Sequence, residues 1–595
     1  MEWVQVYDPL GSPWLSTLAA AFPILLLLVL LGISEWRAHT AAFTALVAAL
    51  AVSVGVFGMP GRLATAAAVY GAAYGLLPIG WIILNAVFLY ALTLHTGQFQ
   101  IVKQSIATLS ADRRIQALLI AFSFGAFVEG AAGFGTPVAI SAALLIGLGF
   151  PPLHAAGLTL IANTAPVAFG AIGTPILTLG AVTGLDPRVL GAMAGRQLPF
   201  VSLIIPFWIV ATMSGRKGLR DTWPAALVCG ASFAVVQFAW SNYVGPELVD
   251  IAGGLVSLVS LAALCRWWQP RETWDFPAGA MASPSAARSA SSTGPLAGAA
   301  AVTTRPHTPA EVVRAWMPWV FLSVFVTLWG LAPVKALLNG GPGGYRAYVA
   351  TGRAPAPGPV LSPTIDVPAL HRLVFREAPV DPQAVDRARL TDGAYKAQRA
   401  EAARYSLNWL SATGTSILFA AILTAVYFQV PPAMLLTIFG QTLIRMRWSL
   451  LTIACMLSLG FVTRYGGTDA TLGLAFTKTG VVYPFFAALL GWLGVALTGS
   501  DTSSNVLFGS LQTITARQLG LDPILIATAN STGGVMGKMI DAQSIVVSTA
   551  ATNQHGQEGR ILRFVFWHSI TLACLMGVIT LLQAYVFTWM VPSRW

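Results

Sequence analysis

The chain has 595 residues, of which 56% are hydrophobic and only 10% are charged. A soluble protein of this length needs far more charge to cover its surface, so the composition excludes a soluble enzyme or binding domain and predicts an all-α membrane protein. The formal net charge of +11 does not indicate a nucleic-acid partner, because Lys and Arg are spread over short loops, as in proteins that span a membrane many times.

Apolar runs long enough to cross a bilayer follow one another through residues 1–268. We expect this part to be a first transmembrane half, in which glycines, prolines and polar residues interrupt two helices, at 129–137 and at 163–175. Such breaks are tolerated at membrane depth only where the backbone is buried in protein or lines a cavity.

Two polar segments divide the rest of the chain. Residues 269–313 are rich in Ala, Ser, Pro and Gly and predict a flexible cytoplasmic loop. A single transmembrane helix over 314–332 separates this loop from residues 333–405, a long polar segment of mixed charge that we expect on the external side.

The second transmembrane half is expected over 406–595, with interruptions at 498–509 and 530–544. Each half then has two broken helices in matching order, an arrangement typical of transporters with inverted repeats and a site at the membrane midplane. The pattern predicts about 12–14 transmembrane helices, counting broken or re-entrant segments.

Short loops with basic residues predict the orientation of the chain. Arg113, Arg114 and the basic residues near Arg216 are expected inside, since cytoplasmic loops carry the excess of Lys and Arg. The segment Asn242–Asp250 carries acidic residues and no basic ones, and is therefore expected outside.

Glu129 and Asp501 are isolated carboxylates within apolar sequence, each at the start of a break. An intramembrane acid is costly when ionised, so we expect both to carry protons. The alternative is a structural ion pair with one of four basic residues, which are Arg196, Arg314, Arg464 and Lys538. Arg464 is expected instead to pair with Asp469 at a loop.

Uncharged polar residues and glycines in the breaks are candidates for binding a small anion, since free N–H groups at a helix start attract negative charge. The candidate substrate-binding residues are Gly133, Asn163, Thr164, Ser503, Ser504, Asn505, Asn530, Ser531, Thr532 and Lys538. The alternative is that the Ser, Thr and Asn side chains cap helices and join neighbouring ones. Lys538 could equally extend its ammonium group to the membrane surface. No metal-ligand or nucleophile motif is found, so no cofactor, metal or catalytic residue is expected.

Several motifs together resemble the bacterial lactate permease family. They are WVQVYDP (Trp3–Pro9), EGAAGFGTPVAI (Glu129–Ile140), NTAPVAFGAIGTPIL (Asn163–Leu177), GRQLPF (Gly195–Phe200), NWLSATGTSILFAA (Asn408–Ala421), GWLGVALTGSDTSSN (Gly491–Asn505), STGGVMGKMI (Ser531–Ile540) and LQAYVFTWMVP (Leu582–Pro592). The resemblance implies import of L-lactate, D-lactate and glycolate with protons across the bacterial cytoplasmic (inner) membrane. The two polar segments are interpreted as departures from the family.

We therefore expect a multi-pass proton symporter for small 2-hydroxymonocarboxylates. By analogy with other carriers that contain paired broken helices, we expect alternating access and consider a homodimer. The main alternative is a sodium-coupled di- or tricarboxylate symporter, whose unwound backbone carbonyls would bind Na⁺. A membrane-embedded enzyme and a passive anion channel are less favoured alternatives.

Overall fold

The computed structural model describes the chain except for residues 1, 33–35, 108, 132, 134, 277–307, 352–360, 382–384, 553, 555–556 and 593–595. Most of the expected cytoplasmic loop at 269–313 therefore lies outside the described residues.

Uncharged runs of Leu, Ala, Val and Phe form helices throughout, because within lipid a helix satisfies its own backbone polar groups. The first part contains α1 (Pro13–Gly32), α2 (Ala38–Gly55), α3 (Gly61–Tyr74), η1 (Gly75–Gly80), α4 (Trp81–His95), α5 (Gln98–Ala107), α6 (Arg113–Ala117), η2 (Leu118–Phe124), α7 (Gly125–Ala131), α8 (Thr136–Gly147), α9 (Pro152–Ala162), η3 (Val167–Phe169), α10 (Gly170–Thr183), α11 (Pro187–Tyr243) and α12 (Val249–Trp267). Gly215, with φ 63° and ψ −159°, divides α11 into two helices.

The second part begins with α14 (Pro309–Gly330), close to the helix expected at 314–332. It continues with α17 (Thr413–Tyr427), α18 (Pro432–Gly466), α19 (Thr468–Phe476), η5 (Thr477–Val482), α20 (Tyr483–Thr498), α21 (Asp501–Gln518), α22 (Pro523–Gly537), α23 (Ala542–Ala551), α24 (Glu558–Tyr585) and η6 (Thr588–Met590).

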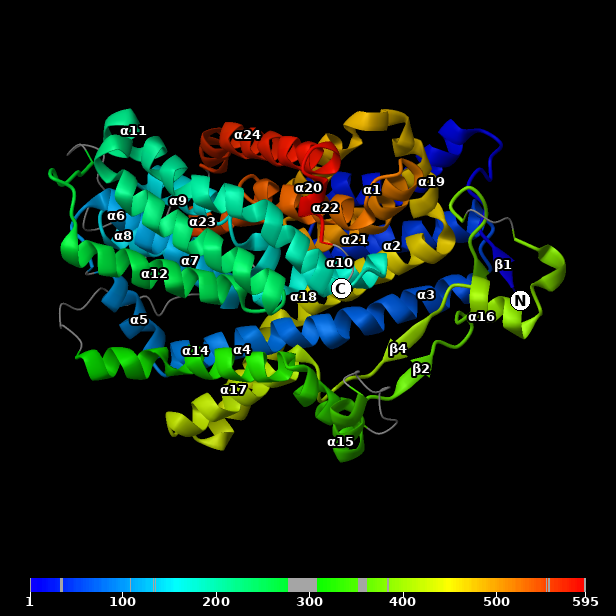
Figure 1. Cartoon of the computed structure of the whole chain (residues 1–595), viewed down its shortest axis with the longest axis horizontal. Helices are drawn as coiled ribbons and strands as arrows, with labels where there is room; N and C mark the ends of the chain where they lie inside the picture. Colours follow the sequence, from blue (N-terminus) through cyan, green and yellow to red (C-terminus); the bar gives the residue numbers. More distant parts are fainter. Residues whose placement is uncertain are drawn as a thin grey trace.

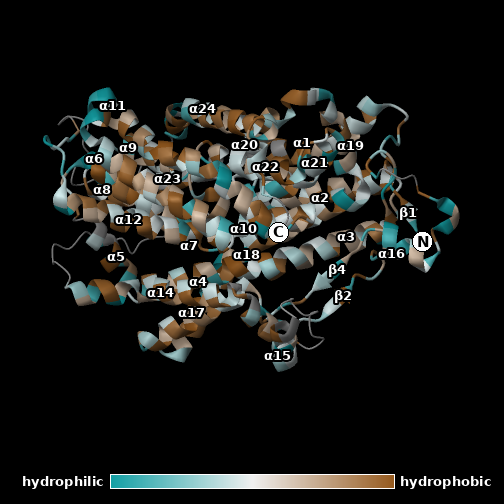
Figure 2. Cartoon of the chain, in the orientation of Figure 1, coloured by the Kyte–Doolittle hydropathy of each residue, from teal (hydrophilic) through white to brown (hydrophobic). Residues whose placement is uncertain are grey.

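The described residues include eight helices that are long and apolar enough to cross a membrane, or nine if the pair α9 and α10, bent by 64°, counts as one span. Four shorter apolar helices accompany them. Hydrophilic residues gather at the two ends of the long axis, near the middle of α11 at one end and near β1 and α16 at the other (Figure 2). The chain is thus an all-α polytopic membrane protein, as its composition predicts.

The segment between α14 and α17 contains α15 (Ala332–Thr351), β2 (Thr364–Asp366), β3 (Val374–Phe375), η4 (Arg387–Arg389), α16 (Gly393–Arg399) and β4 (Arg404–Ser406). The part from β2 to β4 forms a small structured cap at one end of the molecule (Figure 1). β2 pairs antiparallel with β4, and β3 pairs in parallel with β1 (Trp3–Val4). The N-terminus therefore lies beside this cap, at the right of Figure 1.

Four helix breaks lie between the two polar ends, and each has a local cause. Between α7 and α8, Gly133 and Gly135 adopt positive φ, a conformation that glycine reaches without strain. Between α9 and α10, the chain turns through Asn163–Pro166 and η3, and residues 171–173 at the start of α10 also have positive φ. Since two of these, Ala171 and Ile172, are not glycine, the backbone is strained there.

The two breaks of the second half are shorter than expected. Only Gly499 and Ser500 separate α20 from α21, because the Ser500 side chain accepts a hydrogen bond from the Ser503 N–H and caps the new helix. The expected unwinding over 498–509 is therefore wrong from Asp501 onward. Residues 530–537 are likewise helical within α22, and the chain unwinds only over 538–541 before α23.

Candidate functional site

A cavity of about 50 Å³ lies where the four breaks meet. α10 packs against α7 and α21, and α22 packs against α20 and α21, so segments from both halves enclose it. The residues that line it are Glu129, Gly133, Val167, Gly170, Ala171, Thr174, Pro175, Gly499, Ser500, Asp501, Thr502 and Lys538. Two acids and one base from separate segments of the chain thus face one small space.

Glu129 comes from the last turns of α7 and is 4% exposed. Its Oε2 atom has no hydrogen-bond partner among the described residues. Gly170 lies so close that a Cβ built there would be 2.5 Å from Glu129 Oε1. The Asn163 amide is beside the carboxyl group, although neither of its polar atoms is aligned for a hydrogen bond with any described residue. This side of the cavity therefore has several unmet polar atoms.

Asp501, in contrast, is held by its neighbours. Its Oδ2 atom accepts hydrogen bonds from the Ser531 hydroxyl, at 2.5 Å, and from the Asn505 amide, at 3.4 Å. Its Oδ1 atom has no partner in the described part of the chain. One oxygen of Asp501 is therefore fixed by α21 and α22, and the other is free to bind a proton.

The amides behind Asp501 form a buried network that joins both halves. Asn505 donates to the Pro175 carbonyl of α10 at 3.2 Å and accepts from Asn530 at 2.9 Å. Gln512 donates to the Asn530 side-chain oxygen at 3.2 Å, and Ser504 donates to the Gly491 carbonyl at 3.1 Å. Satisfied networks of this kind fix the geometry of a core.

Lys538 follows α22, and its side chain is buried. Its ammonium group donates to the Gly499 carbonyl at 2.6 Å and lies 3.3 Å from Asp541. Lys538 therefore ties together the two breaks of the second half, and it does not extend to the membrane surface. Because it also lines the cavity, it places a positive charge opposite Glu129.

The ion pairs within the described residues bear on the structural alternative expected for the two acids. Neither Glu129 nor Asp501 forms one; Lys538 pairs with Asp541 instead. The expected pair between Arg464 and Asp469 is wrong, because Arg464 lies 3.3 Å from Glu401 of the cap, while Asp469 accepts a hydrogen bond from Ser510.

Of the candidate substrate-binding residues, Gly133 and Lys538 line the cavity and the remainder do not. Thr164 donates to the Ile161 carbonyl at 2.7 Å, and Thr532 donates to Gln197 at 2.7 Å. The Ser503 N–H completes the cap of α21. In this conformation those three residues perform structural tasks, and a substrate role for them stays a prediction.

Sequence reasoning missed several residues of the site. Gly170, Thr174, Pro175, Gly499 and Ser500 line the cavity, and all of them lie within the quoted motifs, so the motifs were the available signal. Asp250 was placed in an external loop, but it is completely buried in the first turn of α12.

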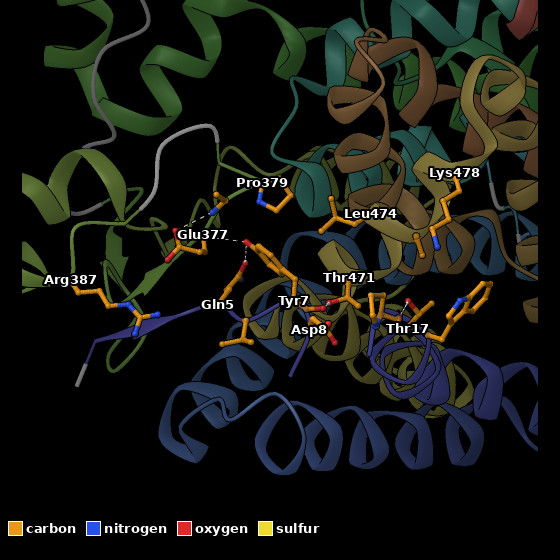
Figure 3. A pocket seen from close by; sticks show the side chains of 15 residues that line it. Gln5, Tyr7, Asp8, Thr17, Glu377, Pro379, Arg387, Thr471, Leu474 and Lys478 are labelled. Carbon is orange, nitrogen blue, oxygen red and sulfur yellow. Dashed lines mark hydrogen bonds between the residues drawn. The ribbon is translucent and has the colours of Figure 1, made fainter. Parts of the chain in front are cut away.

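A second, larger cavity of about 490 Å³ lies beside the cap, between the N-terminal segment and α19 (Figure 3). There the Tyr7 hydroxyl donates to the Gln5 amide oxygen and accepts from the Glu377 N–H. This cavity contains none of the breaks and neither Glu129 nor Asp501, so we assign the chemistry to the smaller one.

The chain was also compared with known proteins. A family model described as L-lactate permease matches residues 16–587. The chain belongs to the L-lactate permease family. It is 47% identical to glycolate permease GlcA of Escherichia coli (strain K12), with 100% of both chains covered. It is 46% identical to the L-lactate permease of Salmonella typhimurium, covering 99% of this chain and 100% of that one. It is 44% identical to the L-lactate permease of Bacillus subtilis (strain 168), with full coverage of both.

One conclusion follows from membership of this family: the chain is a transporter and not an enzyme. The interpretation of the two polar segments as departures from the family stays a prediction.

Proposed function

We propose that the chain imports lactate and related small 2-hydroxymonocarboxylates, such as glycolate, together with protons, by alternating access across the bacterial inner membrane. The observation that carries the proposal is the meeting of Glu129, Asp501 and Lys538 in one cavity enclosed by broken helices from both halves. The substrate class rests on relatives named for L-lactate and glycolate.

The contacts support different roles for the charged residues of the cavity. Lys538 supplies the positive charge that a carboxylate substrate needs, and the break at 499–500 leads into the N-terminus of α21, where free N–H groups favour an anion. Glu129 and Asp501 each keep one buried oxygen without a partner in the described structure. These oxygens are the proton-binding atoms of the proposal, because an ionised carboxylate without a partner is costly in this environment.

Two features favour a proton-coupled carrier of monocarboxylates over the sodium-coupled carrier of di- or tricarboxylates. The Gly499 carbonyl, which an unwound segment could offer to Na⁺, already accepts a hydrogen bond from Lys538. The cavity of about 50 Å³ also suits a three-carbon acid better than a di- or tricarboxylate. We further propose that the two halves are inverted repeats that move relative to each other; a homodimer is compatible with this movement.

Uptake of labelled lactate into proteoliposomes tests the coupling. We expect uptake to increase with an inward proton gradient at constant sodium and to be unaffected by sodium at constant pH. Sodium dependence without pH dependence would refute the proposal and support the alternative carrier.

The variant Glu129→Gln tests the residue assignment. It should abolish accumulation driven by the proton gradient while lactate–lactate exchange continues, since exchange needs no net proton movement. Glu272→Gln is the matched control, because that acid is 77% exposed and pairs only at the surface with Lys217. Full accumulation by Glu129→Gln would remove Glu129 from the coupling mechanism.

A further inference from the structure

Asp250 is a buried acid to which the proposed mechanism gives no role. It lies in the first turn of α12, its side chain is completely buried, and neither carboxylate oxygen has a hydrogen-bond partner within the described residues. An ionised carboxylate in such a place is strongly disfavoured unless a cation or a hydrogen-bond donor compensates it. Buried polar atoms without partners require a functional or structural explanation.

The position of Asp250 connects it with the cavity. A Cβ built on Gly130, the residue after Glu129, would lie 2.8 Å from the Cβ atom of Asp250 and 2.8 Å from the backbone nitrogen of Ile251. The first turn of α12 therefore packs directly on the backbone of α7 beside Glu129.

No cation compensates Asp250 from the helices packed around it. η2 and α10, which pack against α12, contain no ionisable side chain. On α11, Arg196 donates at 2.8 Å to Asn242 and at 2.8 Å to the Met590 carbonyl. The Cys229 thiol, also on α11, contacts Ser257, which lies further along α12 than Asp250. The ionisable residue of α7 next to this contact is Glu129, which precedes Gly130 in the chain.

The Asn163 amide provides an independent indication. It is 3% exposed, lies beside Glu129, and has neither polar atom hydrogen-bonded within the described structure. Glu129, Asn163 and Asp250 of the first half thus have unmet polar atoms among the described residues, as Oδ1 of Asp501 has in the second half.

We propose that Asp250 is a second proton-carrying residue, which shares one proton with Glu129. In the transfer step the O–H bond on Glu129 breaks, an O–H bond forms on Asp250, and the negative charge moves to Glu129, which faces Lys538 across the cavity. No other reactant is needed. This inference rests on the proposed proton-coupled function and adds a residue to it.

The test uses the full-length protein in proteoliposomes with Asp250→Asn and Asp250→Ala. We expect accumulation of labelled lactate under a proton gradient to fall at least tenfold, while lactate–lactate counterflow stays within about threefold of wild type. Asp250→Glu should restore accumulation, because it keeps the carboxyl group. The control is Glu247→Gln, a partly buried acid three residues earlier, which should leave both activities unchanged.

Thermal unfolding of the same variants separates proton carriage from a structural role. Since neither oxygen of Asp250 has a partner, Asp250→Asn and Asp250→Ala should not lower the midpoint. Wild-type accumulation by these variants, loss of counterflow together with accumulation, or a lower midpoint would each overturn the inference. Failure of the wild-type protein to respond to a proton gradient would instead overturn the proposed function.

Discussion

Gly170→Ala tests the site by adding one methyl group beside Glu129. Gly170 has φ −60° and ψ 159°, which alanine adopts without strain, so the effect comes from the Cβ atom alone. That atom would lie 2.5 Å from Glu129 Oε1, whereas real Cβ contacts are essentially never under 3.0 Å. The carboxyl group must therefore move by about 0.5 Å or more, which is the usual tolerance of a functional site.

A displacement of about 1 Å can cost about 100-fold in rate, so we expect Gly170→Ala to lower the rate of proton-driven lactate uptake by about 10- to 100-fold. The overpacked methyl group should also cost about 1–3 kcal/mol of stability, seen as a lower thermal midpoint in detergent. Combining it with Glu129→Asp, which is shorter by one methylene group, should restore part of the midpoint.

Gly440→Ala in α18 is the matched control, because a Cβ there meets nothing within 4 Å. It should leave uptake unchanged and stabilise the helix by up to about 1 kcal/mol. Uptake at the wild-type rate by Gly170→Ala would refute the assignment of this cavity as the transport site.

Two further predictions concern buried charges. Lys538→Met should lower stability by about 3–5 kcal/mol because it leaves Asp541 uncompensated; adding Asp541→Asn should restore the thermal midpoint but not uptake, and wild-type uptake by the double variant would exclude substrate binding by Lys538. Burial raises the pKa of the Glu401 carboxyl group, but Arg376 and Arg464 more than offset this effect, so the net pKa lies below the usual 4.5. The stabilisation from Glu401 is therefore present above about pH 4.5 and lost as the pH falls through the lower folded-state pKa. Glu401→Gln should cost about 3 kcal/mol at pH 7, and a thermal-midpoint difference that is as large at pH 3 as at pH 7 would contradict this origin.

The sequence predicted where the helices break but not how far they unwind. Runs of glycine, proline and polar residues mark all four places, since these residues interrupt helices locally. Asp501 and Ser503, however, are compatible with the first turn of a helix as well as with a break, and Ser500 caps that helix. The small polar residues of α22 stay helical because their side chains bond across to other helices, as Asn530 does to Asn505.

Contacts between distant residues explain the errors at charged positions. Arg464 pairs with Glu401, which lies 63 residues away, and nothing in the local sequence selects this partner over Asp469. Asp250 was assigned to the exterior because its segment carries acidic residues and no basic ones, yet the packing of α12 on α7 buries it. The pair between Lys538 and Asp541 is local, at a spacing of three residues, and was available from the sequence.

The parallel pairing of Trp3 and Val4 with Val374 and Phe375 affects how the protein is made. The amino-terminal strand has no partner until more than half of the chain has left the ribosome, so its docking is a late event in biogenesis. Gln5 donates to the backbone carbonyls of Arg464 and Tyr465, and these hydrogen bonds can form only later still, after α18 has been synthesised. An affinity tag fused ahead of this strand would interfere with its docking, and a carboxyl-terminal tag is the better choice for purification.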